Sequence, residues 1–131
     1  MKTRLFLLAG IALVAADPPV AAHHSFAAEF DAAKPFKVTG AVTKVEWANP
    51  HVWFYIDVKD ETGRIVNWGM EMGSPNGLLR AGWTRNSMKL GEMVTVEGFR
   101  ARDGSDIGNA TVVVLASTGQ KLFAGSSAPR P

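Results

Sequence analysis

Three histidines and two closely spaced methionines of this 131-residue chain are candidate ligands for a soft metal ion. His23 and His24 are adjacent, His51 stands alone, and Met70 and Met72 flank a single glutamate. Thioether sulfur selects Cu(I), and imidazole suits copper well. The chain contains no cysteine, which excludes thiolate metal sites, cysteine nucleophiles and disulfide bonds. Copper is therefore the metal that this set of side chains predicts.

The segments that carry His51 and the methionines predict a β-hairpin. Residues 51–59 and 64–72 are strand-like, and Asp60-Glu61-Thr62-Gly63 between them is typical of a hairpin loop. If those four residues form the loop, Lys59 pairs with Arg64 and the rest of the register follows. The opposed pairs are then Tyr55 with Trp68, Trp53 with Met70, and His51 with Met72. Because side chains alternate along a strand, these six share one face, opposite Val52, Phe54, Ile56 and Val58.

Three interpretations of the six-residue face remain open. Trp, Tyr and Met are good core residues, so the face could simply pack against a helix or the N-terminal segment. Trp53, Tyr55 and Trp68 could instead form a platform for a sugar, a peptide or a protein partner. The third interpretation is a copper site, because opposed side chains lie about 4.5–5.5 Å apart at Cβ and could share an ion.

The first 22 residues follow the pattern of a secretory signal peptide. Lys2 and Arg4 precede the apolar run 5–16, and Val20-Ala21-Ala22 supplies the small residues of a cleavage site. The apolar run is shorter than the roughly 20 residues that a spanning helix needs. We therefore expect cleavage after Ala22, a periplasmic or secreted protein, and no membrane span in the mature form.

Cleavage after Ala22 would leave His23 as the N-terminal residue. Its α-amine and ring nitrogen could chelate copper, with His24 or His51 as a further ligand. The ligands bind in their neutral forms, so affinity should rise with pH near the amine pKa of about 7.7–8.0. The alternative is that His23 and His24 belong to a solvated arm.

Charge and motif content favour a binding protein over an enzyme or a nucleic-acid binder. Cleavage of the signal peptide removes Lys2, Arg4 and Asp17. The mature chain is then near neutral, although the pI of the precursor is about 9.2. Its charge therefore gives no indication of nucleic-acid binding. No serine-centred nucleophile motif, phosphate loop or HExxH is present. We expect no catalytic residues.

The order of expected elements predicts an all-β domain with one short helix, a five-stranded OB-like small barrel of order β-β-β-α-β-β. The alternative is an open β-sandwich fragment, which this number of elements hardly fills. The phase of the first strand slips beside Gly40, which suggests a bulged, bent strand. The expected organisation is a signal peptide (1–22), an N-terminal arm (23–35), the barrel (36–124) and a disordered tail (125–131). Its elements are strands at 36–47, 51–59, 64–72, 93–102 and 110–117, a helix at 76–81 and a helical turn at 86–90.

Two resemblances accompany these patterns. The blocks AHHSFAAEFD (22–31), VTKVEWANPHVW (42–53), NWGMEMGSPNGLLRAGWTR (67–85) and GEMVTVEGFRARDGS (91–105) resemble an uncharacterised family of small exported bacterial proteins. One His, two Met and a Trp also resemble the periplasmic copper-efflux chaperone, an OB-type barrel. That resemblance implies Cu(I) ligation by His51, Met70 and Met72 under a Trp68 lid, although one residue rather than two separates Trp68 from Met70.

Overall fold

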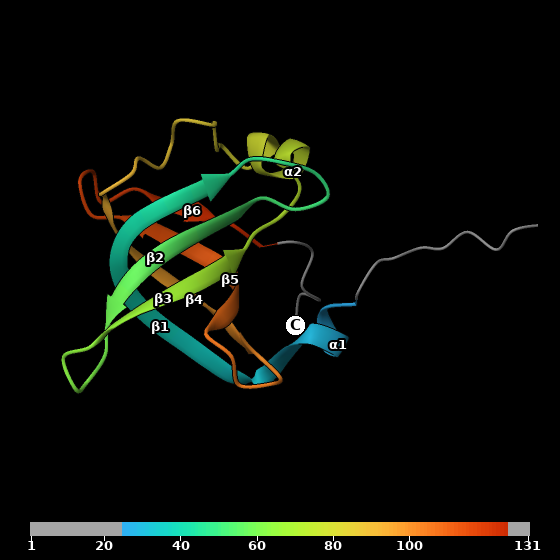
Figure 1. The fold of residues 1–131 in the computed structure, drawn as a ribbon. Coiled ribbons are helices and arrows are strands. Elements are labelled where there is room, and N and C mark those ends of the chain that lie inside the picture. Colours follow the sequence, from blue (N-terminus) through green and yellow to red (C-terminus); the bar gives the residue numbers. More distant parts are fainter. Residues whose placement is uncertain (1–24, 126–131) are drawn as a thin grey trace, which may run out of the picture.

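The computed structural model describes residues 25–125, which form a β-sheet with two short helices (Figure 1). The elements in chain order are α1 (Phe26–Glu29), β1 (Phe30–Glu46), β2 (Trp53–Lys59), β3 (Ile65–Glu71), α2 (Pro75–Arg80), β4 (Met93–Ala101), β5 (Ile107–Leu115) and β6 (Lys121–Phe123). The expected β-rich class is confirmed. The helix expected at 76–81 is also confirmed as α2, where Pro75 occupies the first turn and Ser74 Oγ accepts the Gly77 N–H.

The six strands form one sheet in the order β3-β2-β1-β4-β5-β6. Neighbours in this order are antiparallel, and β3 additionally pairs with β5 in parallel through Gly69, Met70 and Glu71. That extra pairing brings the first strand of the order back against the fifth, so the sheet curls round on itself. Figure 1 shows β1 bending round the side of the sheet to reach both β4 and β2.

A bulge lets β1 make this bend. The register between β1 and β2 shifts between Val42 and Lys44, as the slip in the sequence pattern predicted. Gly40 lies just before the bulge, where a Cβ would be only 2.3 Å from the Asp57 carbonyl oxygen. Only glycine allows the two backbones to approach so closely.

The register of the central hairpin differs by one residue from the expected one. Lys59 pairs with Ile65, not Arg64, and Asp60 N–H donates to the Arg64 carbonyl (2.8 Å). Three residues are left in the loop, and the last of them, Gly63, has φ of 84°. A three-residue loop that ends in a left-handed glycine is a common hairpin connection. The assumption of a four-residue loop was wrong, and it moved every residue of β3 to the wrong face.

The hydrophobic core lies between the curled strands and under α2. The loop after α2 contributes Trp83, which is 2% exposed and donates its Nε1–H to the Phe123 carbonyl (2.9 Å). This bond connects the α2 region to β6, a short strand that the sequence did not predict. The helical turn expected at 86–90 was also not found, because these residues form irregular turns and bends and no helix.

The expected N-terminal arm is partly wrong. β1 begins at Phe30, so residues 30–35 belong to the sheet, and α1 precedes them. A register shift between Phe30 and Pro35 breaks the alternation, which explains why the sequence pattern hid this part of the strand. The expected signal peptide, His23 and His24, and residues 126–131 of the expected tail lie outside the described residues.

Candidate functional site

The side chains expected to form one metal-binding face are divided between the two faces of the hairpin. Met70 pairs with Phe54, and Trp68 pairs with Ile56, so both point into the core. Met70 and Met72 are 0% and 1% exposed. Trp68 is buried between the Phe36 ring, at 5.2 Å between centroids, and the Arg100 guanidinium, 5.0 Å from the Trp68 ring centroid. The shared face of His51, Met70, Met72 and Trp68 was therefore wrongly predicted.

His51 contacts a carboxylate on the outer face instead of a thioether. Its Nδ1 lies 2.8 Å from Glu71 Oε1 and 3.0 Å from the Met72 carbonyl oxygen. Because both partners are acceptors, Nδ1 carries the hydrogen, and a neutral ring has its lone pair on Nε2. Among residues 25–125, no group of three or more His, Asp or Glu side chains is placed to hold a metal ion.

Two of the predicted platform residues, Trp53 and Tyr55, do share the outer face. They pair with Glu71 and Gly69 of β3, and both are half-buried. A Cβ on Gly69 would meet Tyr55 Cε1 at 3.3 Å and Trp53 Cζ3 at 3.6 Å. Both rings thus reach over the backbone of Gly69, because this residue has no side chain to lift them away.

A groove of about 430 Å³ runs along these rings, and we call it the aromatic groove. It is lined by Glu46, Trp53, Tyr55, Asn67, Gly69, Asp106 and Ile107. The lining comes from the end of β1, from both hairpin strands, and from the junction of the β4–β5 loop with β5. Segments distant in sequence therefore meet at one surface, with an aromatic wall and polar edges.

Arg100 positions the loop that supplies Asp106. Its guanidinium donates to Asp106 Oδ1 (2.8 Å) and to the carbonyls of Gly104 (3.0 Å) and Ser105 (3.1 Å). The Gly69 N–H donates to the Asp106 carbonyl (3.0 Å), which holds the same loop against β3. Four hydrogen bonds thus fix this edge of the aromatic groove before any ligand arrives.

The opposite edge holds a cation. Lys44 Nζ forms an ion pair with Glu46 and lies 5.4 Å from the Tyr55 ring centroid. Tyr55 Oη donates to Glu46 Oε2 (3.3 Å). The hydrogen bond with Lys44 lowers the pKa of Glu46, and the same contact raises the pKa of Lys44. Burial, with Glu46 adding to it, raises the pKa of the Tyr55 hydroxyl, so this edge holds one ammonium, one carboxylate and a neutral phenol at neutral pH.

Asn67 completes the polar edge beside Tyr55. Its Nδ2 donates to Asp57 Oδ1 (2.8 Å) and to Thr43 Oγ1 (3.2 Å). These contacts fix the orientation of the amide. The aromatic groove therefore combines flat apolar rings with hydrogen-bonding groups of fixed direction, as ligand sites commonly do.

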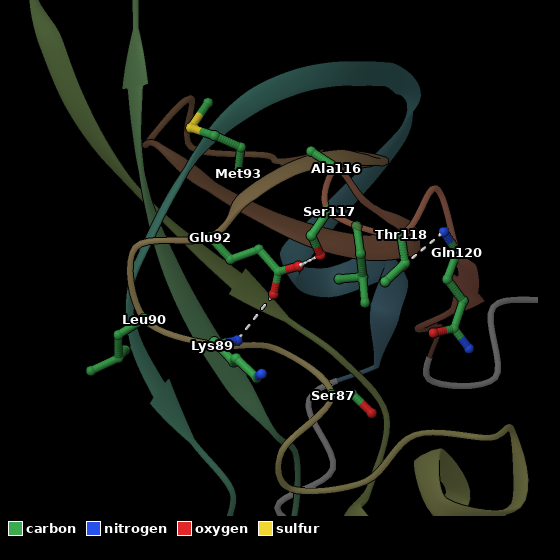
Figure 2. A pocket seen from close by; sticks show the side chains of 10 residues that line it. Ser87, Lys89, Leu90, Glu92, Met93, Ala116, Ser117, Thr118 and Gln120 are labelled. Atoms are coloured by element: carbon green, nitrogen blue, oxygen red, sulfur yellow. Dashed lines mark hydrogen bonds between the residues drawn. The ribbon is translucent and has the colours of Figure 1, made fainter.

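A second hollow of about 680 Å³ lies between the loop before β4 and the β5–β6 turn (Figure 2). Its carboxylate, Glu92, accepts the Lys89 N–H (3.2 Å) and a hydrogen bond from Ser117 Oγ, as the dashed lines in Figure 2 show. The Ser117 bond and the Lys89 bond lower the pKa of Glu92. This carboxylate joins two loops, so we assign it a structural role.

The sequence alone did not indicate Glu46, Asn67, Gly69 or Asp106 as site residues. Each stands singly among residues of ordinary type, and only pairing of the strands brings them together. The one usable signal was Gly69, a glycine inside a strand pattern, which often marks close approach of other groups.

Comparison with known proteins shows the family but no activity. The family model of DUF6152, a family of unknown function, matches residues 11–110, so the chain belongs to that family. The expected resemblance to an uncharacterised family is confirmed to this extent. No curated protein and no solved structure matches the chain. In the described part of the chain, neither helix is long and apolar enough to cross a membrane.

Proposed function

We propose that this member of DUF6152 is a small exported binding protein that docks a protein or peptide partner in the aromatic groove. The observation that carries this proposal is the placement of the Trp53 and Tyr55 rings over Gly69, between fixed polar edges. Large aromatic side chains that are only half-buried in a rigid setting are the anchors that binding surfaces favour.

The strand order supports an OB-like barrel. The pairings β1–β2–β3–β5–β4–β1 form a ring, and α2 lies between β3 and β4 in the chain. OB barrels bind ligands on the face of strands 2 and 3, with help from the loops after strands 1 and 4. The aromatic groove lies at the corresponding place, because Glu46 ends β1 and Asp106 belongs to the β4–β5 loop.

The open form of the groove favours a partner over an enclosed small molecule. Small-molecule sites usually bury most of their ligand. In contrast, both rings are only half-buried, and Glu46 and Asp106 keep 42% and 43% of their side-chain surface exposed. A peptide or protein surface that continues beyond the edges would cover the groove more completely.

Export and the absence of catalysis are further parts of this proposal. Export is supported by the signal-like pattern of residues 1–22, which the sequence alone provides. The lack of recognisable catalytic motifs supports a binding role.

Selection from a random peptide display library tests the proposed function. The purified protein is the bait, and each selected clone is tested again on Trp53→Ala and on Phe123→Ala. Phe123 is 68% exposed and lies outside the groove, so it is a matched aromatic control. We expect binders that lose affinity by tenfold or more with Trp53→Ala, as expected for an anchor residue, and keep it with Phe123→Ala. Binders that ignore Trp53, or their complete absence, would contradict docking in this groove.

Copper binding at the N-terminus is a separate proposal of ours. It is supported by the His23-His24 pair after the expected cleavage site, and it no longer involves Met70 or Met72. Copper titration of the exported, processed protein tests it, with His23→Ala as the variant and mass spectrometry of the terminus as the control. Equal affinity of parent and variant would exclude the chelate.

A further inference from the structure

We propose that the partner inserts an arginine or lysine side chain into the aromatic groove, at the place that Lys44 holds in the free protein. This inference depends on the proposed function, since it names the chemistry of the partner that the aromatic groove receives. It makes the groove a receptor for a basic peptide segment, regulated by an internal lysine.

The charge of the groove indicates a cation. Of the residues that line it, the charged ones are Glu46 and Asp106, and both are carboxylates. A carboxylate has two oxygens with about four acceptor positions, so a bond from Lys44 or Arg100 leaves room for another donor. Trp53 and Tyr55 stand on β2, which lies between β1, the strand that ends at Glu46, and β3, which pairs on its other side with β5 next to Asp106. Aromatic faces attract ammonium and guanidinium groups, so the wall and the edges favour the same ligand charge.

Lys44 already places a cation against this surface. Its ammonium lies over the Tyr55 ring and beside the Glu46 carboxylate, both of which face the aromatic groove. The side chain of Lys44 is 60% exposed, so water and a competing cation can reach the ion pair. Exposed ion pairs contribute little to stability, and a second cation can therefore displace this one at small cost.

The same geometry disfavours an anionic partner. An incoming carboxylate or phosphate would meet Glu46 and Asp106, and the two neighbouring cations, Lys44 and Arg100, are already paired with these carboxylates. Like charges at such distances repel. A sugar carries no charge, so the charge of Lys44 would not change its affinity. The dependence of affinity on charge therefore distinguishes a basic partner from a sugar.

Titration with two matched peptides tests this inference. The probes are capped Gly-Arg-Gly-Arg-Gly and the same peptide with citrulline in place of arginine, which keeps the shape and removes the charge. Binding to the full, ¹⁵N-labelled protein is followed by NMR. We expect shifts at the groove residues and affinity about tenfold higher for the arginine peptide, because charged hydrogen bonds are the stronger ones. Equal affinity for the two peptides would overturn the inference.

Variants of the edge residues give the sharper result. Lys44→Gln should increase affinity for the arginine peptide about two- to fivefold, since it removes a competitor held by a weak exposed contact. Glu46→Gln should decrease it about tenfold. Lys59→Gln is the control, because it removes one positive charge from the end of β2, away from the Tyr55 and Glu46 contacts. If the Lys44→Gln variant bound the arginine peptide no more tightly than the Lys59→Gln variant, displacement of Lys44 would be excluded.

The two proposals fail in different ways. Some ligands could depend on Trp53 and yet lack a basic group, as peptides without arginine or lysine and oligosaccharides do. Such ligands would refute the basic partner and leave the groove as a binding site. Loss of every Trp53-dependent ligand would refute the proposed function itself. Thermal unfolding of each variant checks that it is folded before binding is measured.

Discussion

Both faces of the β2–β3 hairpin carry large aromatic side chains, but in different surroundings. The inner face carries Phe54, Trp68 and Met70 and is almost completely buried. The outer face carries Trp53 and Tyr55, whose rings lie over Gly69 and are half-buried. Aromatic content alone therefore does not distinguish the core face from the outer face. The difference comes from register, which decides what each ring contacts.

The largest expected effect is the loss of a core methionine. Met70→Ala should reduce the free energy of unfolding by about 2–5 kcal/mol, because the side chain is fully buried and leaves a cavity. Met93→Ala is the matched control, since Met93 is 45% exposed and should cost less than about 1 kcal/mol. Urea denaturation measures both. Equal costs would mean that Met70 lies on an exposed face and that the register is wrong.

A smaller effect should follow from adding one methyl group on the outer face. Gly69→Ala would place a Cβ 3.3 Å from Tyr55, so the ring must move by a few tenths of an ångström. We expect stability to change by less than about 1 kcal/mol, while tryptophan emission and affinity for the arginine peptide change. Gly125→Ala is the control, because its Cβ meets nothing nearer than 4.0 Å. Unchanged emission and affinity would mean that the rings do not rest over Gly69.

The smallest effect should come from the loop that sets the register. Asp60 Oδ1 accepts bonds from Thr62 Oγ1 (2.6 Å), Thr62 N (2.8 Å) and Arg64 N (3.0 Å), and the first of these contributes most to lowering the pKa of Asp60. A lowered folded-state pKa stabilises the protein above the unfolded pKa of about 4 and loses this contribution as pH falls through the folded value.

Asp60→Asn should therefore lower the Tm slightly at pH 7, and the difference from the parent should shrink below about pH 4. Thermal unfolding across pH measures it. Glu61→Gln removes a charge from the same loop without altering the Asp60 bonds, and serves as the control. A Tm difference that is constant down to pH 2 would show that the ionised carboxylate does not hold the turn.

Several parts of the fold were predictable because local patterns decide them. The bulge in β1 follows from the slip beside Gly40, and α2 follows from Ser74 and Pro75 at its start. Membership of an uncharacterised family also followed from contiguous blocks of sequence. The start of β1 at Phe30 and the strand β6 were not predictable from the sequence. Pairing with other strands, and not an alternating pattern of their own, makes these segments strands.

The sequence by itself determined that Trp53 and Tyr55 lie on the same side of β2, because side chains alternate along any strand. Which side Met70 and Met72 occupy relative to them was decided by the tertiary structure. The positive φ of Gly63 allows a loop of three residues where four were expected. Because side chains alternate with a period of two, this change of one residue moves every side chain of β3 to the opposite face. The meeting of Glu46, Gly69 and Asp106 likewise required the pairing of β1, β2, β3 and β5, a long-range arrangement that no local pattern encodes.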